Sequence, residues 1–171
     1  MSGAALRGMV VRIMSATHTH PTKRNLTARL ERAAQNCVAR GSKLTQIRRD
    51  VLALVLSAGE PVGAYALLDR LRAQTGQGQP PTIYRALEFL LEQGLIHKIE
   101  RLNAFVPCQD ECDHPHPVQF FICRQCGAAT EIEDAAIAQA VAAAAARNGF
   151  VVGATMVEVD GVCAKCAARP A

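Results

Sequence analysis

The sequence contains no tryptophan, and its two Tyr and five Phe make up only 4% of 171 residues. Half of the residues are nevertheless hydrophobic, and Ala and Leu carry most of this apolar content. Because all-β folds draw on aromatic and β-branched residues, this bias favours helices. The length suits one domain or two small ones and excludes a large multidomain enzyme.

Long apolar runs are also missing. No window approaches the roughly 18 consecutive apolar residues of a membrane span, and Arg7 and Arg12 interrupt the apolar core that a signal peptide needs. We therefore expect a cytoplasmic protein without a membrane partner, in which residues 1–22 form a mobile tail with solvent-exposed His18 and His20. Cytoplasmic thiols stay reduced, so the seven cysteines indicate metal or redox chemistry rather than disulfides.

Negative charge is scarce in the first part of the chain. Residues 1–100 carry fourteen Lys and Arg against seven acidic side chains, a net charge of +7. Residues 101–171 carry five basic and eight acidic side chains, a net charge of −3. This division, hidden in the overall +4, predicts a basic N-terminal part that faces a polyanion and a C-terminal part with another role.

Four of the cysteines form two C-x-x-C pairs, Cys123 with Cys126 and Cys163 with Cys166. Two such pairs can wrap one tetrahedral ion and complete a four-sulfur zinc site. The 36 residues between the pairs exceed the usual zinc-ribbon gap of about 15 to 20, and they must accommodate a helix and a strand. The alternative is a dithiol redox centre at each pair, but neither pair has a thioredoxin-like context. The pattern therefore predicts a shared structural zinc.

Apolar residues recur at helical spacing in four segments of the basic part. The expected helices run from residue 25 to Gly41, from the N-cap Thr45 to Gly59, from after Gly63 to Thr75, and from Pro80 to Gly94. Cys37 falls on the apolar face of the first helix and is expected to pack there as a small apolar residue. Two strand-like stretches follow, over residues 95–100 and 104–107, which is the winged form of the helix-turn-helix architecture.

The C-terminal part reads as a separate α+β unit. The apolar residues of segment 108–117 show neither helical nor strand periodicity, so this segment is expected to be a linker. Strands are expected over residues 118–122, 128–132 and 150–159, with an alanine-rich helix over residues 134–148. A unit of this size needs a metal or a partner subunit for stability. The predicted fold class is α+β, with a winged helix-turn-helix domain over residues 23–107, a hinge linker over 108–117 and a small α/β domain over 118–171.

The second helix of a helix-turn-helix unit lies in the major groove of DNA. Here that helix opens with Thr82, Tyr84 and Arg85, which can contact phosphates, thymine methyls or a guanine edge. Tyr65 is a further candidate for a phosphate contact. Supporting positive charge comes from Lys43, Arg48, Arg49, Arg70, Arg72 and Lys98. Ordinary solvated helix faces would give a similar pattern, but the wing and the basic half favour DNA binding.

Three stretches resemble the ferric uptake regulator superfamily and, within it, the zinc uptake regulators: residues 80–100, residues 121–127 and the pair Cys163/Cys166. The resemblance extends from about residue 25 to Cys166. It implies a homodimeric repressor with an N-terminal winged-helix domain, a C-terminal dimerisation domain, a structural zinc and a regulatory metal at the hinge. It places the structural ligands on Cys123, Cys126, Cys163 and Cys166, and the regulatory ligands on His97, Cys108, His116 and Glu131.

The regulatory donor set of one thiolate, two imidazoles and a carboxylate suits zinc better than iron or manganese. We therefore expect two zinc ions per chain and a zinc-loaded homodimer that binds double-stranded operator DNA and represses zinc-uptake genes. A shared ion would fix the relative orientation of the two DNA-reading domains. Cys112 and His114 lie in the same linker and are additional candidate metal ligands.

Two alternatives remain open at this point. An iron- or redox-responsive regulator of the same superfamily would share the fold, and a redox sensor would need reductant rather than metal to recover DNA binding. A zinc-dependent enzyme is the weaker alternative, because the deaminase signature, a glycine-rich phosphate loop and a G-x-S-x-G elbow are absent from the sequence. Four cysteines would also leave the ion no position for substrate. We therefore expect a protein that is not an enzyme.

Overall fold

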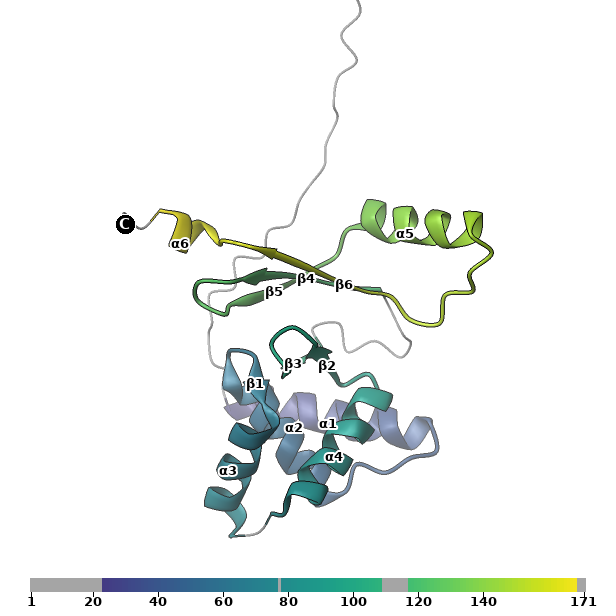
Figure 1. Ribbon diagram of the computed structural model, residues 1–171. Helices are drawn as coiled ribbons and strands as arrows, with labels where there is room; N and C mark the ends of the chain where they lie inside the picture. The colour runs from purple at the N-terminus through teal and green to yellow at the C-terminus, as the bar shows by residue number, and fades with distance from the viewer. Residues whose placement is uncertain (1–22, 77, 109–116, 169–171) are drawn as a thin grey trace, which may run out of the picture.

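The computed structural model describes residues 23–76, 78–108 and 117–168, which form a helical part and a smaller part built on a second sheet (Figure 1). The helical part contains α1 (Lys23–Ala39), α2 (Gln46–Ala58), β1 (Val62–Gly63), α3 (Ala64–Thr75), α4 (Pro80–Glu92), β2 (Ile96–Ile99) and β3 (Ala104–Pro107). The second part contains β4 (Val118–Cys123), β5 (Ala129–Ile132), α5 (Ala135–Arg147), β6 (Met156–Gly161) and α6 (Ala164–Ala167). The predicted α+β class is confirmed.

The helices begin and end close to the predicted positions. Thr45 is the N-cap residue of α2, although its side chain makes no capping hydrogen bond. Gly59 ends the same helix at φ 70°, a left-handed conformation that a side chain would strain. Asp134 caps α5, because its carboxylate accepts hydrogen bonds from the backbone N–H groups of Ala136 and Ile137 at 2.7 and 3.3 Å. Local sequence signals therefore suffice to place these helix ends.

One hydrophobic core joins α1–α4 to the wing formed by β2 and β3. Val51, Leu67 and Leu90 are among its fully buried side chains. Cys37 is buried in the same core, as predicted from its position on the apolar face of α1. Burial raises the pKa of the Cys37 thiol, which favours the protonated, apolar form. This core makes the helical part a rigid platform for the wing.

The wing is part of a three-stranded antiparallel sheet in the order β1-β3-β2. We did not predict β1 from the sequence, because a strand of two residues is too short to show an alternation of apolar and polar side chains. Its pairing with β3, Val62 opposite Phe105 and Gly63 opposite Ala104, ties the start of α3 to the wing. The first helix of the helix-turn-helix unit, α3, is thereby fixed to the wing.

The second sheet has the order β5-β4-β6, with β5 antiparallel and β6 parallel to the central β4. The predicted start of the last strand at residue 150 is wrong, since β6 begins at Met156. Met156 pairs with Val118, the first residue of β4, so the preceding residues have no neighbouring strand to pair with. The sequence also missed the short helix α6, which follows Cys163.

The wing lies between the helices and the second sheet, and α5 lies on the opposite side of that sheet (Figure 1). Ile99 and Val106 of the wing share a second hydrophobic cluster with Val118, Phe120 and Ile122 of β4. In contrast, α5 contains no buried residue. Within the described ranges, no helix is long and apolar enough to cross a membrane.

Candidate metal centres and nucleic-acid interface

The two C-x-x-C pairs meet at one end of the second sheet. Cys123 is the last residue of β4, and Cys126 follows in a turn. The parallel register sets Cys123 opposite Gly161 at the end of β6, which brings Cys163 and Cys166 alongside the first pair. All four Sγ atoms lie within 4.8 Å of one another. The sheet pairing thus closes the 36-residue gap between the two cysteine pairs.

The geometry of this four-cysteine cluster fits a tetrahedral zinc ion. With Zn–S bonds of about 2.3 Å, the sulfur atoms of a tetrahedron are about 3.8 Å apart. The Sγ atoms of Cys126 and Cys163 are 3.9 Å apart. Four thiolates would fill the coordination sphere and leave no position for a substrate or water, as in structural zinc sites.

The thiols of Cys123 and Cys166 differ in how readily they lose a proton. The Sγ of Cys123 accepts a hydrogen bond from the backbone N–H of Cys163 at 3.3 Å. This bond and a second from the N–H of Cys126 lower the pKa of Cys123 to about 6. Hydrogen bonds with Cys163 and Cys126 raise the pKa of Cys166 to about 12. The Cys123 thiolate is thus available to an arriving cation, whose charge would favour loss of the Cys166 proton.

Three of the four regulatory-metal candidates lie near the contact between the two parts. His97 is on β2, Cys108 directly follows β3 and Glu131 is on β5. The His97 ring meets the Phe120 ring edge-on at a centroid distance of 6.2 Å, and Phe120 pairs directly with Glu131. Nε2 of His97 and Oε2 of Glu131 are both buried, as is Cys108. Phe120 is therefore the shared neighbour of an imidazole and a carboxylate from different parts of the chain.

Within the part of the chain that the structure describes, one group of potential metal ligands brings its ligand atoms together: the four cysteines, whose sulfur atoms lie within 4.8 Å of one another. The fourth candidate, His116, lies outside the described residues, together with Cys112 and His114. The assignment of the regulatory ligands thus stays a prediction.

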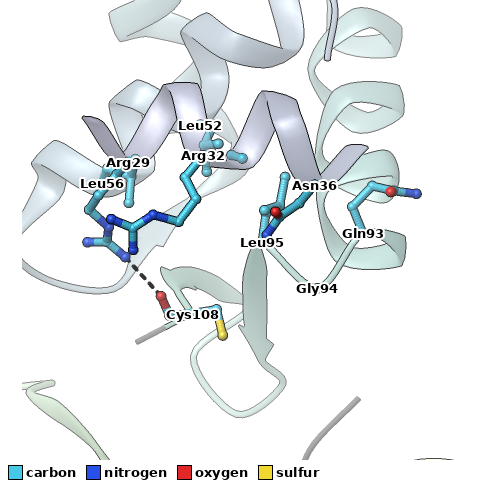
Figure 2. A pocket seen from close by; sticks show the side chains of 10 residues that line it. Arg29, Arg32, Asn36, Leu52, Leu56, Gln93, Gly94, Leu95 and Cys108 are labelled. Carbon is cyan, nitrogen blue, oxygen red and sulfur yellow. Dashed lines mark hydrogen bonds between the residues drawn. The ribbon is translucent and has the colours of Figure 1, made fainter. Parts of the chain in front are cut away.

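No sequence pattern indicated that Arg29 contacts a candidate ligand. Its Nη2 donates a hydrogen bond of 2.9 Å to the backbone carbonyl of Cys108, 79 residues away (Figure 2). The sulfur of Cys108 points away from Arg29 in this view. Burial lowers the pKa of Arg29, whereas the charge of a Cys108 thiolate would raise it. Helix α1 therefore holds the main chain of Cys108 in place.

The predicted DNA-contacting side chains are exposed around α3 and α4. Tyr65 is 72% exposed and Tyr84 is 48% exposed. Both line one open cavity of about 530 Å³, together with Lys98 and Asn103 of the wing. On α4, Arg85 is exposed and Thr82 is partly buried. The structure thus brings the start of α3, the first turns of α4 and the wing to one surface.

The basic side chains around α2 divide into two groups. Lys43 is exposed and Arg49 is partly buried, so both have contact with solvent. Arg48 instead lies over the Phe89 ring at 3.6 Å and donates a hydrogen bond to the carbonyl of Lys43 at 2.8 Å. Arg48 therefore links α2 to α4.

Comparison with known proteins places this arrangement in context. The model of the ferric uptake regulator family matches residues 39–160. The zinc uptake regulation protein of Escherichia coli (strain K12) is 39% identical over 137 residues, which cover 80% of each chain. A structure of a zinc uptake regulator complexed with zinc and DNA aligns with a TM-score of 0.78 at 38% identity, covering 83% of this chain and 95% of that one. The crystal structure of holo XcZur aligns with a TM-score of 0.76 at 44% identity, covering 83% and 99%.

Proposed function

The chain belongs to the ferric uptake regulator family, and we propose that it is a zinc-responsive transcriptional repressor. In this proposal a zinc-loaded homodimer binds operator DNA and represses genes for zinc uptake. The observation that carries it is the four-cysteine cluster, whose sulfur spacing fits zinc in a chain similar to zinc uptake regulators. The similarity of the fold to a zinc uptake regulator in complex with zinc and DNA supports the same function.

Two zinc ions per chain are part of the proposal. One is the structural ion of Cys123, Cys126, Cys163 and Cys166. The second is a regulatory ion held by His97, Cys108, His116 and Glu131, with Cys112 and His114 as alternative ligands. The burial of His97 Nε2, Cys108 and Glu131 Oε2 supports this set, because ligands shielded from water bind a metal ion with less competition from solvent.

The regulatory ligands come from different parts of the chain, and this arrangement suggests how zinc controls DNA binding. His97 and Cys108 belong to the wing, whereas Glu131 belongs to the second sheet. An ion shared among them would fix the wing relative to the dimer. Two reading domains must match half-sites about one helical turn, or 34 Å, apart, so a fixed orientation favours binding. By linkage, DNA would tighten zinc binding by the same factor.

The proposed division of labour follows the predicted boundaries. Residues 23–107 form the DNA-binding domain with Tyr65, Thr82, Tyr84, Arg85, Lys43 and Arg49 at the DNA, residues 108–117 form the hinge, and residues 118–171 form the dimerisation domain. A group of large apolar side chains is exposed on the second part, which supports pairing with a second copy. They are Phe121, Phe150, Val151, Val152, Met156, Val159 and Val162. Family membership and the filled coordination sphere of a four-cysteine zinc favour a regulator over an enzyme.

The regulatory set can be tested by metal analysis and DNA binding on the same samples. We expect two zinc ions per chain in the wild type and one in His97→Ala, which should remain folded but gain no DNA affinity with zinc. His116→Ala and His114→Ala form a matched pair, since both remove an imidazole from the hinge. Loss of one zinc in His116→Ala alone supports the assignment. Two zinc ions and a full zinc response in His97→Ala would contradict it.

A further inference from the structure

The turn at the tip of the wing is held by an acidic side chain of the second sheet. Oε1 of Glu158 on β6 accepts a hydrogen bond from the backbone N–H of Glu100 at 2.7 Å, and Oε2 accepts one from the N–H of Arg101 at 3.2 Å. Next to this pair, Nε of Arg101 lies 2.7 Å from Oδ1 of Asp160. A carboxylate that accepts two backbone N–H bonds is a stronger tether than a neutral hydrogen bond.

Glu158 belongs to a row of side chains that runs straight across the second sheet. Phe120 on β4 pairs with Glu131 on one side and with Glu158 on the other. Directly paired residues project from the same face of a sheet. Phe120 packs against Ile99 and Val106, so this face is the one that meets the wing. The face of the second sheet that contacts the wing therefore carries Glu131, Phe120 and Glu158 in one row across the strands.

The spacing of this row matches the distance along the chain from His97 on β2 to Glu100 in the turn. From Glu131 to Glu158 the row spans two strand separations, about 9.6 Å. From His97 to Glu100 the chain advances three residues, about 10 Å in a strand. His97 can therefore lie near Glu131 at one end of the row while the N–H of Glu100 reaches Glu158 at the other. The wing has two attachment points, one at the candidate metal site and one at Glu158.

We propose that Glu158 is a positioning residue that fixes the rotation of the DNA-binding domain about the regulatory metal site. A single attachment at the ion leaves the wing free to turn about that point, whereas a second attachment about 10 Å away stops the rotation. The Arg101–Asp160 pair adds little to this attachment, because its side chains are 51% and 34% exposed and water screens the attraction. The DNA-binding measurement described below rests on the proposed function, whereas the hydrogen bonds between Glu158 and the wing turn do not.

The variant Glu158→Gln tests this role, because it keeps the side-chain size but offers only one acceptor oxygen and no charge. Glu100→Gln and Asp160→Asn are matched controls. Both remove one negative charge close to the same turn but leave the Glu158 carboxylate and the two backbone donors in place. Removing a negative charge by itself strengthens binding to DNA. The proposal predicts the opposite sign for Glu158→Gln alone.

The measurements are DNA affinity, zinc content and amide hydrogen exchange of the full-length, zinc-saturated protein. The DNA probe is a fluorescein-labelled duplex selected from a random pool by the zinc-loaded wild type. We expect Glu158→Gln to bind it about tenfold more weakly, within the range of allosteric couplings, with two zinc ions retained and faster exchange at residues 100 and 101. Both controls should bind at least as tightly as the wild type.

Affinity of Glu158→Gln equal to that of the controls would overturn the proposal, and so would unchanged exchange at residues 100 and 101. Loss of zinc in step with loss of affinity would also overturn it, because Glu158 would then act through the metal site. If the wild type itself showed no zinc-dependent DNA binding, the proposed function would fail, while the exchange measurement would still decide whether Glu158 anchors the wing.

Discussion

Replacing Cys126 by Ser should unfold the second part of the molecule and leave the helical part folded. Cys126 is the most suitable of the four cysteines for this test, because it is exposed while Cys123 and Cys166 are only 4% and 8% exposed. Removing an exposed thiol creates no cavity in a core. Any loss of stability in Cys126→Ser therefore reports the loss of the zinc ion rather than the loss of packing.

The expected effect is large because the second part has little core of its own. In β4, Val118, Phe120 and Ile122 are buried, and α5 has no buried residue. At about 1.5–3 kcal/mol for each side chain, these three contribute about 5–9 kcal/mol. Structural zinc contributes about 10–16 kcal/mol in zinc-finger peptides. The ion thus stabilises this part by more than its core does, whereas α1–α4 have a separate and larger core.

Amide hydrogen exchange followed by mass spectrometry resolves the two parts. In Cys126→Ser, and in wild type treated with a strong chelator, we expect protection to be lost in β4–β6 and α5 and kept in α2 and α4. Cys112→Ser is the matched control, since it removes a cysteine outside the cluster and should leave both parts protected. Protection of β4–β6 without zinc would refute the reasoning, and so would simultaneous loss of protection in α2 and α4.

Two further predictions concern the DNA surface and the wing turn. Arg85→Ala should weaken DNA binding by about 1–3 kcal/mol if Arg85 contacts a base, whereas Arg147→Ala at the end of α5 should have a much smaller effect. Fluorescence anisotropy at fixed salt measures the DNA affinity of both variants. If the two variants bound DNA equally well, Arg85 would not belong to the interface. Asn103 has a φ of 45°, so Asn103→Val should lower the free energy of unfolding by about 1–2 kcal/mol, and Asn103→Gly should change it little. Urea unfolding measures this difference, and equal stability of the two variants would contradict the conformational argument.

The features predicted from the sequence were those with local signals. Thr45 and Gly59 mark the ends of α2. Each C-x-x-C pair is a motif of only four residues, and the two pairs together indicate a zinc site. The start of β6 could not be predicted in this way, because it depends on where the partner strand β4 begins. The hydrogen bonds of Arg29 to Cys108 and of Glu158 to the wing turn join residues 57 to 79 positions apart. Such contacts leave no periodic pattern, since they depend on how the two parts meet.

The regulatory ligands illustrate the same limit. His97, Cys108 and Glu131 lie on separate elements, and no spacing rule connects them. The prediction of this set came from the resemblance to a family rather than from the chemistry of the residues. The structure adds a physical connection, because Phe120 contacts the ring of His97 and pairs with Glu131.

The most direct test of the account is the affinity of the full-length protein for the selected duplex, measured by anisotropy across buffered free zinc at fixed salt. We expect the structural ion to stay bound throughout, and the affinity for DNA to rise between about 5-fold and 150-fold as a second zinc ion per chain binds. DNA affinity that does not change as the second ion binds, or that recovers with reductant in the absence of added zinc, would contradict this expectation.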